Sequence, residues 1–329
     1  MTHPRTARWL VAPDKFRGTY SSREAAEAIA RGLGPHAQVC PTADGGEGTL
    51  AVLLDALEGE RLTCQVHDPL GRERQVQFGL LADGELAIVE SASASGLALL
   101  TEAERDPEYA STFGTGELIV AAAATGASRV AVAVGGAAST DGGMGAVEAL
   151  ARGGGLRGAQ LIVLADVDIA FERAAAMFAP QKGADEATVA RLSARLQTLA
   201  AAFPRDPRGV PMTGAAGGLA GGLWAHAGAE LVRGAAWVLD AVGFQERLAG
   251  ADAVVSGEGR LDATTLQGKL LSEIARRCAA AGVPLHAVVG SCALGQAGIE
   301  RLGLRSVREA STLEELELAG RALTGETAL

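Results

Sequence analysis

Three loops combine glycine with acidic side chains in a pattern that suits phosphate chemistry. They occupy residues 43–49 (Ala-Asp-Gly-Gly-Glu-Gly-Thr), 135–143 and 256–262. Glycine lets backbone N–H groups approach a phosphate closely, and a carboxylate beside phosphate requires a divalent cation between them, usually Mg²⁺. The loops therefore predict a nucleotide-phosphate site with magnesium. Each loop alone could instead be an ordinary turn with an aspartate that caps a helix.

Lysine usage points to the same chemistry. Only three of the 29 basic side chains are lysines, namely Lys15, Lys182 and Lys269, and each stands beside a loop signal. The compact charge of lysine commonly neutralises transferring phosphates. The alternative is a chain whose composition favours arginine, with three lysines left by chance.

Other familiar site patterns are missing or lack their context. A P-loop requires a glycine five residues before Gly268, where Ala263 stands. Residues 153–158 match Gly-x-Gly-x-x-Gly but follow a predicted helix instead of a strand. The five histidines are scattered, and no Gly-x-Ser-x-Gly elbow is present. These observations argue against zinc and serine hydrolases.

Short apolar runs alternate with helical patterns along most of the chain. Strands alternating with helices indicate a parallel sheet, and residues 61–81 suit a β-hairpin with a Pro/Gly turn. We expect two α/β domains, the first built from both chain ends (1–60 and 215–329) and the second inserted (61–214). The predicted strands are 9–12, 86–90, 130–134, 251–256 and 285–289, and the predicted helices are 21–33, 116–124, 186–202 and 272–281.

Length, charge and cysteine content limit the class of protein. A chain of 329 residues corresponds to roughly two domains, and its net charge of −10 disfavours nucleic acid and anionic membranes as partners. Four scattered cysteines without a Cys-x-x-Cys pair fit a reducing cytoplasm. We find no signal peptide, and the most apolar stretch, 118–138, is interrupted by Arg129. We expect a cytoplasmic protein whose oligomeric state, homo-oligomer included, the sequence leaves open.

With these motifs identified, the chain resembles the glycerate kinase type-1 family over nearly its whole length. Residues 12–18 are similar to the family's opening Ala-Pro-Asp-Ser-Phe-Lys-Gly, 43–49 to its Ala-Asp-Gly-Gly-Glu-Gly-Thr, and 68–72 to its Asp-Pro-Leu-Gly-Arg turn. The remaining matches follow in family order at 114–119, 180–184, 214–219, 257–262 and 268–269.

Several positions depart from the family pattern. Lys15 and Arg17 stand where the family has serine and lysine, and residues 137–140 read Ala-Ala-Ser-Thr instead of Ser-Ala-Thr-Asn. The segment after Asp166 is shorter than in the family. We expect these changes to affect substrate orientation or turnover.

The resemblance implies two unlike α/β domains, one flavodoxin-like with a parallel sheet and one inserted with a mixed sheet, and an active site in the cleft between them. It also implies transfer of the γ-phosphoryl group of ATP to a hydroxyl of D-glycerate, the 2-hydroxyl in preference to the 3-hydroxyl, with 2-phosphoglycerate and ADP as products.

Phosphoryl transfer requires mainly positioning and charge stabilisation, and on that basis we assign candidate roles. The catalytic candidates are Asp44, Asp166, Lys182, Arg260, Asp262 and Lys269. The glycines expected to bind the nucleotide are Gly45, Gly46, Gly135, Gly136, Gly257 and Gly259. The substrate-binding candidates are Asp14, Arg17, Glu47 and Ser139, and the Mg²⁺ ligands are Asp44, Asp141 and Glu258.

Each assignment has a structural alternative: Asp44 could cap a helix, Asp166 could order a loop, and Asp262 could pair with Arg260 at the surface. Two other functions remain open for the whole chain. One is a nucleotide-dependent oxidoreductase, because a glycine-rich parallel α/β chain also suits NAD. The other is a non-catalytic sensor of sugar acids or nucleotides on the same scaffold.

Overall fold

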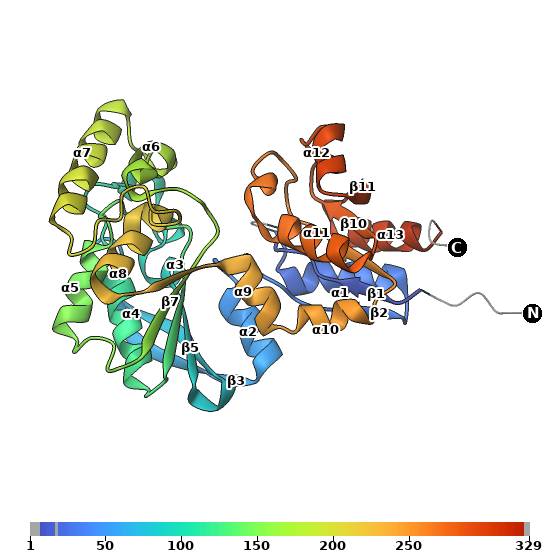
Figure 1. The fold of residues 1–329 in the computed structure, drawn as a ribbon, viewed down its shortest axis with the longest axis horizontal. Coiled ribbons are helices and arrows are strands. Elements are labelled where there is room, and N and C mark those ends of the chain that lie inside the picture. The colour runs from blue at the N-terminus through green and yellow to red at the C-terminus, as the bar shows by residue number, and fades with distance from the viewer. Residues whose placement is uncertain (1–6, 17–18, 326–329) are drawn as a thin grey trace, which may run out of the picture. The chain divides into compact units, whose positions relative to one another are not determined.

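The structure is a computed structural model that describes residues 7–16 and 19–325. The chain divides into two compact units (Figure 1). Unit 1 comprises residues 1–44 and 235–329, and unit 2 comprises residues 45–234.

Unit 2 is longer at both ends than the range 61–214 expected for the inserted domain. At its start, α2 (Thr49–Leu57) packs on β4 (Glu73–Leu81). At its end, β8 (Glu230–Arg233) pairs with β7 (Gln160–Ala165). Helix α2 therefore packs on the sheet of unit 2, and β8 is its edge strand.

Unit 1 is built on a five-stranded sheet in which all neighbours are parallel. The spatial order β11-β10-β9-β1-β2 becomes 2-1-3-4-5 when read from the other edge and numbered within the unit, which is the flavodoxin-like order. The order reverses between β1 and β9. The strands are β1 (Trp9–Val11), β2 (Ala37–Val39), β9 (Ala253–Ser256), β10 (Leu285–Val289) and β11 (Leu304–Glu309).

Helices pack against this sheet and against each other. Helix α1 begins with a capping box, in which the Ser21 hydroxyl accepts from the Glu24 N–H and the Glu24 carboxylate accepts from the Ser21 N–H. A Cβ at Gly320 of α13 would lie 2.3 Å from the Ile29 carbonyl oxygen of α1, so glycine allows these two helices to touch. The helices are α1 (Ser22–Leu33), α9 (Gly234–Ala241), α10 (Phe244–Ala249), α11 (Leu270–Ala281), α12 (Gln296–Arg301) and α13 (Leu313–Thr324), with a 3-10 turn at Thr265–Gln267.

Unit 2 has a mixed six-stranded sheet in the order β3-β4-β5-β6-β7-β8. Strand β4 runs antiparallel to both β3 and β5, and β5 to β8 are mutually parallel. The carboxyl ends of every strand except β4 therefore lie at one edge. The remaining strands are β3 (Gly59–His67), β5 (Leu86–Glu90) and β6 (Arg129–Ala133).

The core of unit 2 forms between this sheet and its helices, with Val89, Val132 and Val163 buried against Leu118 and Leu223. A separate small core surrounds Phe171, Leu192 and Leu196. The other helices are α3 (Ser91–Ser95), α4 (Phe113–Ala124), α5 (Met144–Arg152), α6 (Ala174–Phe178), α7 (Glu186–Ala202) and α8 (Leu219–Ala227). Short 3-10 turns lie at Ala82–Gly84, Leu97–Leu99, Glu102–Glu104, Phe171–Arg173, Pro180–Lys182 and Ala215–Gly218.

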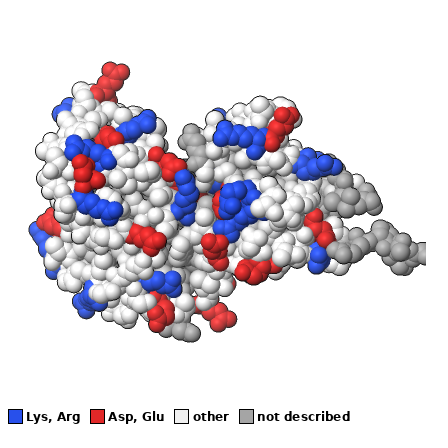
Figure 2. Space-filling view, in the orientation of Figure 1, with Lys and Arg blue, Asp and Glu red and all other residues white. Residues whose placement is uncertain are grey.

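The flavodoxin-like parallel sheet and the mixed sheet confirm the fold class that the sequence predicts. Within residues 7–16 and 19–325, no helix combines the length and apolarity needed to cross a bilayer. Basic and acidic side chains intermingle on the visible face of both units (Figure 2).

Candidate active site

The reversal point of the unit 1 sheet brings two of the predicted acids together. Asp14 follows β1 and Glu258 follows β9, and the Asp14 N–H donates to the Gly257 carbonyl at 2.8 Å. Both side chains are partly buried. Open parallel sheets bind their ligands outside the carboxyl ends of the strands at such a point.

Burial, with a smaller contribution from neighbouring carboxylates, raises the pKa values of the acids at this point. Burial, and then the charge of Asp44, raise the pKa of Asp14 to about 8. Burial also raises the pKa of Glu258, although the Thr265 hydroxyl donates to Glu258 Oε1 at 2.6 Å and opposes this shift. A bound cation would relieve this concentration of negative charge.

Asp14, Asp44 and Glu258 do not form a complete metal cage. Across the described part of the chain, no group of three or more His, Cys, Asp or Glu residues is arranged to hold a metal ion. Mg²⁺ is usually held by one or two carboxylates together with phosphate oxygens and water. The chemistry of Asp44 and Glu258 therefore fits a cation that arrives with a nucleotide.

Glycines join the loops that follow β9 and β10. A Cβ at Gly257 would lie 1.7 Å from the Val288 carbonyl oxygen, and one at Gly290 would lie 2.5 Å from the Gly259 carbonyl oxygen. The Gly290 N–H donates to the Glu258 carbonyl at 3.0 Å. Gly257 is thus required for packing between neighbouring strands, whatever it does for a ligand.

Lys269 stands at the N-cap of α11, beside a connected set of polar groups. Its ammonium donates to the Thr264 hydroxyl at 2.7 Å, and that hydroxyl donates to Asp262 Oδ1 at 2.6 Å. Arg260 lies 3.4 Å from Asp262 and is 68% exposed. Asp262 and Arg260 therefore pair with each other at the surface.

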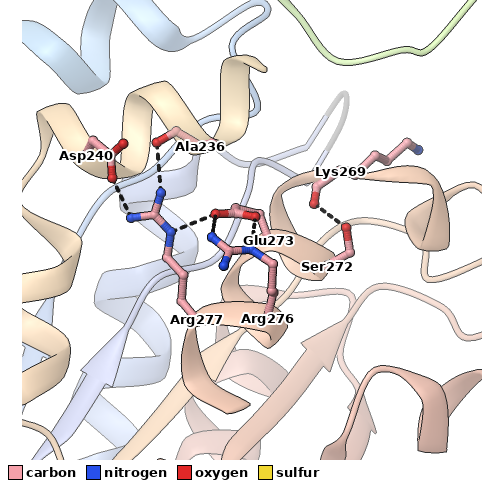
Figure 3. A network of polar contacts seen from close by, with 7 residues as sticks. All are labelled: Ala236, Asp240, Lys269, Ser272, Glu273, Arg276 and Arg277. Carbon is pink, nitrogen blue, oxygen red and sulfur yellow. Dashed lines mark hydrogen bonds and ion pairs between the residues drawn. The ribbon is translucent and has the colours of Figure 1, made fainter. Parts of the chain in front are cut away.

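A buried arginine fixes α11 to α9 (Figure 3). The Arg277 guanidinium donates to Asp240 at 2.7 Å, to the Ala236 carbonyl at 3.0 Å and to Glu273 at 2.8 Å. Burial would raise the pKa of Glu273, but hydrogen bonds from Arg276 and Arg277 lower it. This network positions the helix whose first turn carries Lys269.

A cavity of about 370 Å³ lies beside the C-terminal half of α11, away from Lys269 and the predicted site residues. It is lined by Asp240, Gln245, Arg276, Arg277, Ala280 and Ala281.

In unit 2, the start of α2 already has an anionic partner. Glu90, at the carboxyl end of β5, accepts from the Gly48 N–H at 2.9 Å and from the Leu50 N–H at 2.8 Å. Gly45 has a φ of +90°, and a Cβ there would lie 2.4 Å from the Gly234 Cα. The glycines of this loop thus serve backbone packing and a helix cap, and Glu47 beside them is exposed.

Asp141, in the loop after β6, is buried and fully hydrogen-bonded. Its Oδ2 accepts from the Thr112 N–H at 2.8 Å, the Thr112 hydroxyl at 2.7 Å and the Gly145 N–H at 3.2 Å. Its Oδ1 accepts from the Gly143 N–H at 3.1 Å. Asp141 therefore anchors the first turn of α5, whereas Asp44 and Glu258 belong to unit 1.

The same loop surrounds a buried lysine. Lys182 is 2% exposed, and its ammonium donates to the Ser139 carbonyl at 2.5 Å. Burial lowers the pKa of Lys182 to about 8, against the opposing charge of Asp141. The Ser139 hydroxyl is buried and has no hydrogen-bond partner within the described part of the chain.

The other predicted site residues of unit 2 lie near the same sheet edge. Gly135 and Gly136 follow β6, and Gly136 has a φ of +61°. Asp166, directly after β7, is partly buried. Asp168 forms an ion pair with Arg233, at the carboxyl end of β8. Arg17 lies outside the described residues.

Four polar residues with structural roles at these loops are absent from the sequence prediction: Glu90, Thr112, Arg233 and Thr265. Glu90 ends the predicted strand 86–90, so its place at the sheet edge could have identified it. Thr112 carries no local signal, because its partner Asp141 is 29 residues away.

Comparison with known proteins shows the family to which this chain belongs. The model of the glycerate kinase family matches residues 9–155 and 153–319. The chain belongs to the glycerate kinase family.

Relatives match over most of their length. A glycerate kinase from Halalkalibacterium halodurans is 35% identical, over 90% of this chain and 88% of that protein. A glycerate 2-kinase from Escherichia coli is 34% identical, over 86% and 84% respectively. The crystal structure of a protein described as glycerate kinase 2 from Salmonella typhimurium LT2 is similar, with a TM-score of 0.83, 30% identity and 98% coverage of both chains. These similarities support kinase activity on glycerate and favour neither an oxidoreductase nor a sensor.

Proposed function

We propose that this protein transfers the γ-phosphoryl group of ATP to the 2-hydroxyl of D-glycerate and forms 2-phosphoglycerate and ADP. The observation that carries the nucleotide assignment is the set of partly buried acids, Asp14, Asp44 and Glu258, at the reversal point of the unit 1 sheet. The glycerate 2-kinase from Escherichia coli among the relatives supports the 2-position.

Unit 1 offers both signs of charge that a metal-bound triphosphate needs. Asp44 and Glu258 would hold Mg²⁺, which when bound supplies positive charge to the phosphate oxygens. Lys269 and Arg260 would neutralise further phosphate charge beside the first turn of α11, whose N-cap residue makes no side-chain cap hydrogen bond.

The reaction forms one bond and breaks one. The glycerate hydroxyl oxygen bonds to the γ-phosphorus, the bond from that phosphorus to the β,γ-bridging oxygen breaks, and the hydroxyl proton passes to a carboxylate of the site. Because this step needs little covalent chemistry from the protein, charge and positioning supply most of the rate.

The direct test is a coupled assay for ADP with D-glycerate and magnesium ATP, followed by phosphorus NMR of the product. We expect D-glycerate-dependent ADP release and a phosphate ester whose coupling pattern shows attachment to carbon 2. ATP alone and L-glycerate are the controls.

Each other outcome contradicts a defined part of the proposal. Attachment to carbon 3 contradicts the 2-position, and activity undiminished by EDTA contradicts the metal. A melting temperature raised by NADH but not by magnesium ATP would indicate the oxidoreductase.

A further inference from the structure

Lys182 contacts the protein's own backbone instead of facing solvent. It lies in the turn Pro180–Lys182 and is 2% exposed. Its ammonium is 2.5 Å from the Ser139 carbonyl oxygen and 3.5 Å from the Thr140 hydroxyl oxygen. Both acceptors belong to the loop at residues 135–143, so the Lys182 ammonium makes its hydrogen bonds to that loop.

Burying this ammonium costs stability. An ammonium in a low-dielectric interior loses its hydration, and only a carboxylate that is free to pair with it would restore much of that free energy. Asp141, the carboxylate whose charge acts on Lys182, already accepts four hydrogen bonds. Burial accordingly lowers the pKa of Lys182. Because the buried Lys182 ammonium destabilises the fold, we look for a role of Lys182 in function.

Lys182 and the Pro107 carbonyl together fix one peptide unit from both ends. The carbonyl of the Ser139–Thr140 peptide accepts from Lys182, and its N–H, which belongs to Thr140, donates to the Pro107 carbonyl at 3.1 Å.

Glycines with positive φ stand on both sides of this peptide, Gly136 at +61° before it and Gly142 at +67° after it. Glycine backbone can pivot, so the clamped peptide sets the shape of the loop between them. It also sets the orientation of the buried Ser139 hydroxyl, which has no partner among the described residues.

We propose that Lys182 is a positioning residue for phosphoryl transfer. Its ammonium holds the Ser139–Thr140 peptide, and through it the loop after β6, in the shape that binds substrate, and it does not contact phosphate. This inference rests on the proposed function, because it takes the loop at 135–143 to border the substrate. It replaces the direct catalytic role that the sequence predicts for Lys182.

The first test is hydrogen exchange of the substrate-free protein, comparing Lys182→Met with Gln181→Met. Gln181 is the exposed neighbour in the same turn. We expect the amides of the loop to exchange about tenfold faster in Lys182→Met, as the loss of one charged hydrogen bond predicts, and to be unchanged in Gln181→Met. We also expect kcat to fall roughly a hundredfold in Lys182→Met only.

The second test is rescue of Lys182→Ala by added propylammonium, which supplies an ammonium group to the space that the side chain leaves. Loop protection and kcat should recover together as the amine concentration rises. Ethylene glycol, a neutral molecule of similar size, should restore neither.

A loop that exchanges normally in Lys182→Met while kcat collapses would overturn the proposal, because Lys182 would then act on the phosphate itself. So would a Lys182→Met protein that fails to fold, because the lysine would then stabilise the fold. The two claims fail separately. A wild-type protein that releases no ADP refutes the proposed function, whereas hydrogen exchange, which is measured without substrate, still shows whether Lys182 holds the loop.

Discussion

Two loops that share a pattern of glycine and aspartate use their charges in opposite ways. In the loop at 256–262, Arg260 is 68% exposed and pairs with Asp262 near the first turn of α11. In the loop at 135–143, Asp141 is 3% exposed and gives both oxygens to its own backbone and to Thr112. Glycine beside an acid therefore marks the end of a parallel strand, but the surrounding elements decide whether that acid pairs at the surface or holds the loop.

The largest effect on activity is expected for Asp44 of unit 1, and the largest effect on stability for Asp141, which anchors a loop of unit 2. Asp44→Ala should lower kcat by roughly a hundredfold or more, because on the proposed function it removes a charge that acts in the transition state. Its free energy of unfolding should stay close to that of the wild type. Steady-state kinetics and urea unfolding check the two expectations.

Asp141→Ala is the matched variant in the other loop. It leaves four donors without an acceptor and should lower the free energy of unfolding by about 3 kcal/mol. If Asp141→Ala is as stable as Asp44→Ala, the difference between the two loops does not exist in solution.

Gly257 and Gly135, one from each loop, should differ in the same way but by less free energy. Gly257→Ala places a Cβ 1.7 Å from the Val288 carbonyl oxygen, so the backbone must move, and we expect a loss of about 2 kcal/mol. At Gly135 the nearest atom to such a Cβ is 3.7 Å away, which is ordinary contact. Gly135→Ala should change stability by less than about 0.5 kcal/mol.

Thermal and urea unfolding of both glycine variants decide this comparison. A Gly135→Ala protein that is stable but slow would show that the missing side chain makes room for a ligand. Equal destabilisation at both positions would contradict the packing argument.

Two pH dependences of stability, with opposite signs, test the burial of single charged groups, and both are measured by urea unfolding in metal-free buffer. The folded-state pKa of Asp14 is raised from 3.8 to about 8, so this group costs stability progressively as pH rises through that range. Asp14→Asn should therefore gain stability relative to the wild type over that range. The pKa of Lys182 is lowered from 10.5 to about 8, so its cost is full below about pH 8 and disappears as pH rises to 10.5.

Any gain in the free energy of unfolding of Lys182→Met over the wild type should accordingly disappear at alkaline pH. Gln181→Met is the control for the lysine. Parallel pH profiles for the wild type and either test variant would contradict the burial of that group.

Much of the fold follows from local patterns, because buried parallel strands and capped helices carry strong signals. The predicted ranges 86–90, 285–289 and 186–202 coincide with β5, β10 and α7. Helix α4 begins at residue 113 instead of 116. Gly114 lies in its first turn, and only glycine fits at this position because a Cβ would lie 1.8 Å from the His67 carbonyl oxygen.

Long-range partners limit what the sequence predicts. Helix α2 begins inside a glycine loop and is capped by Glu90, which lies 42 residues after Gly48. The acids Asp14 and Glu258 follow predicted strands, but their proximity depends on the adjacency of β1 and β9. The burial of Lys182 and Asp141 depends on segments 29 to 43 residues away, which no local pattern encodes.

The place of β1 in its sheet has a consequence for biosynthesis. Trp9 pairs with Ala253, so a strand made at the start of translation waits for a partner made near its end. Until then, the unpaired edge and apolar face of β1 are open to contacts with other nascent chains. Products that terminate before residue 253 keep that edge permanently, so premature termination yields aggregation-prone fragments even when unit 2 is complete.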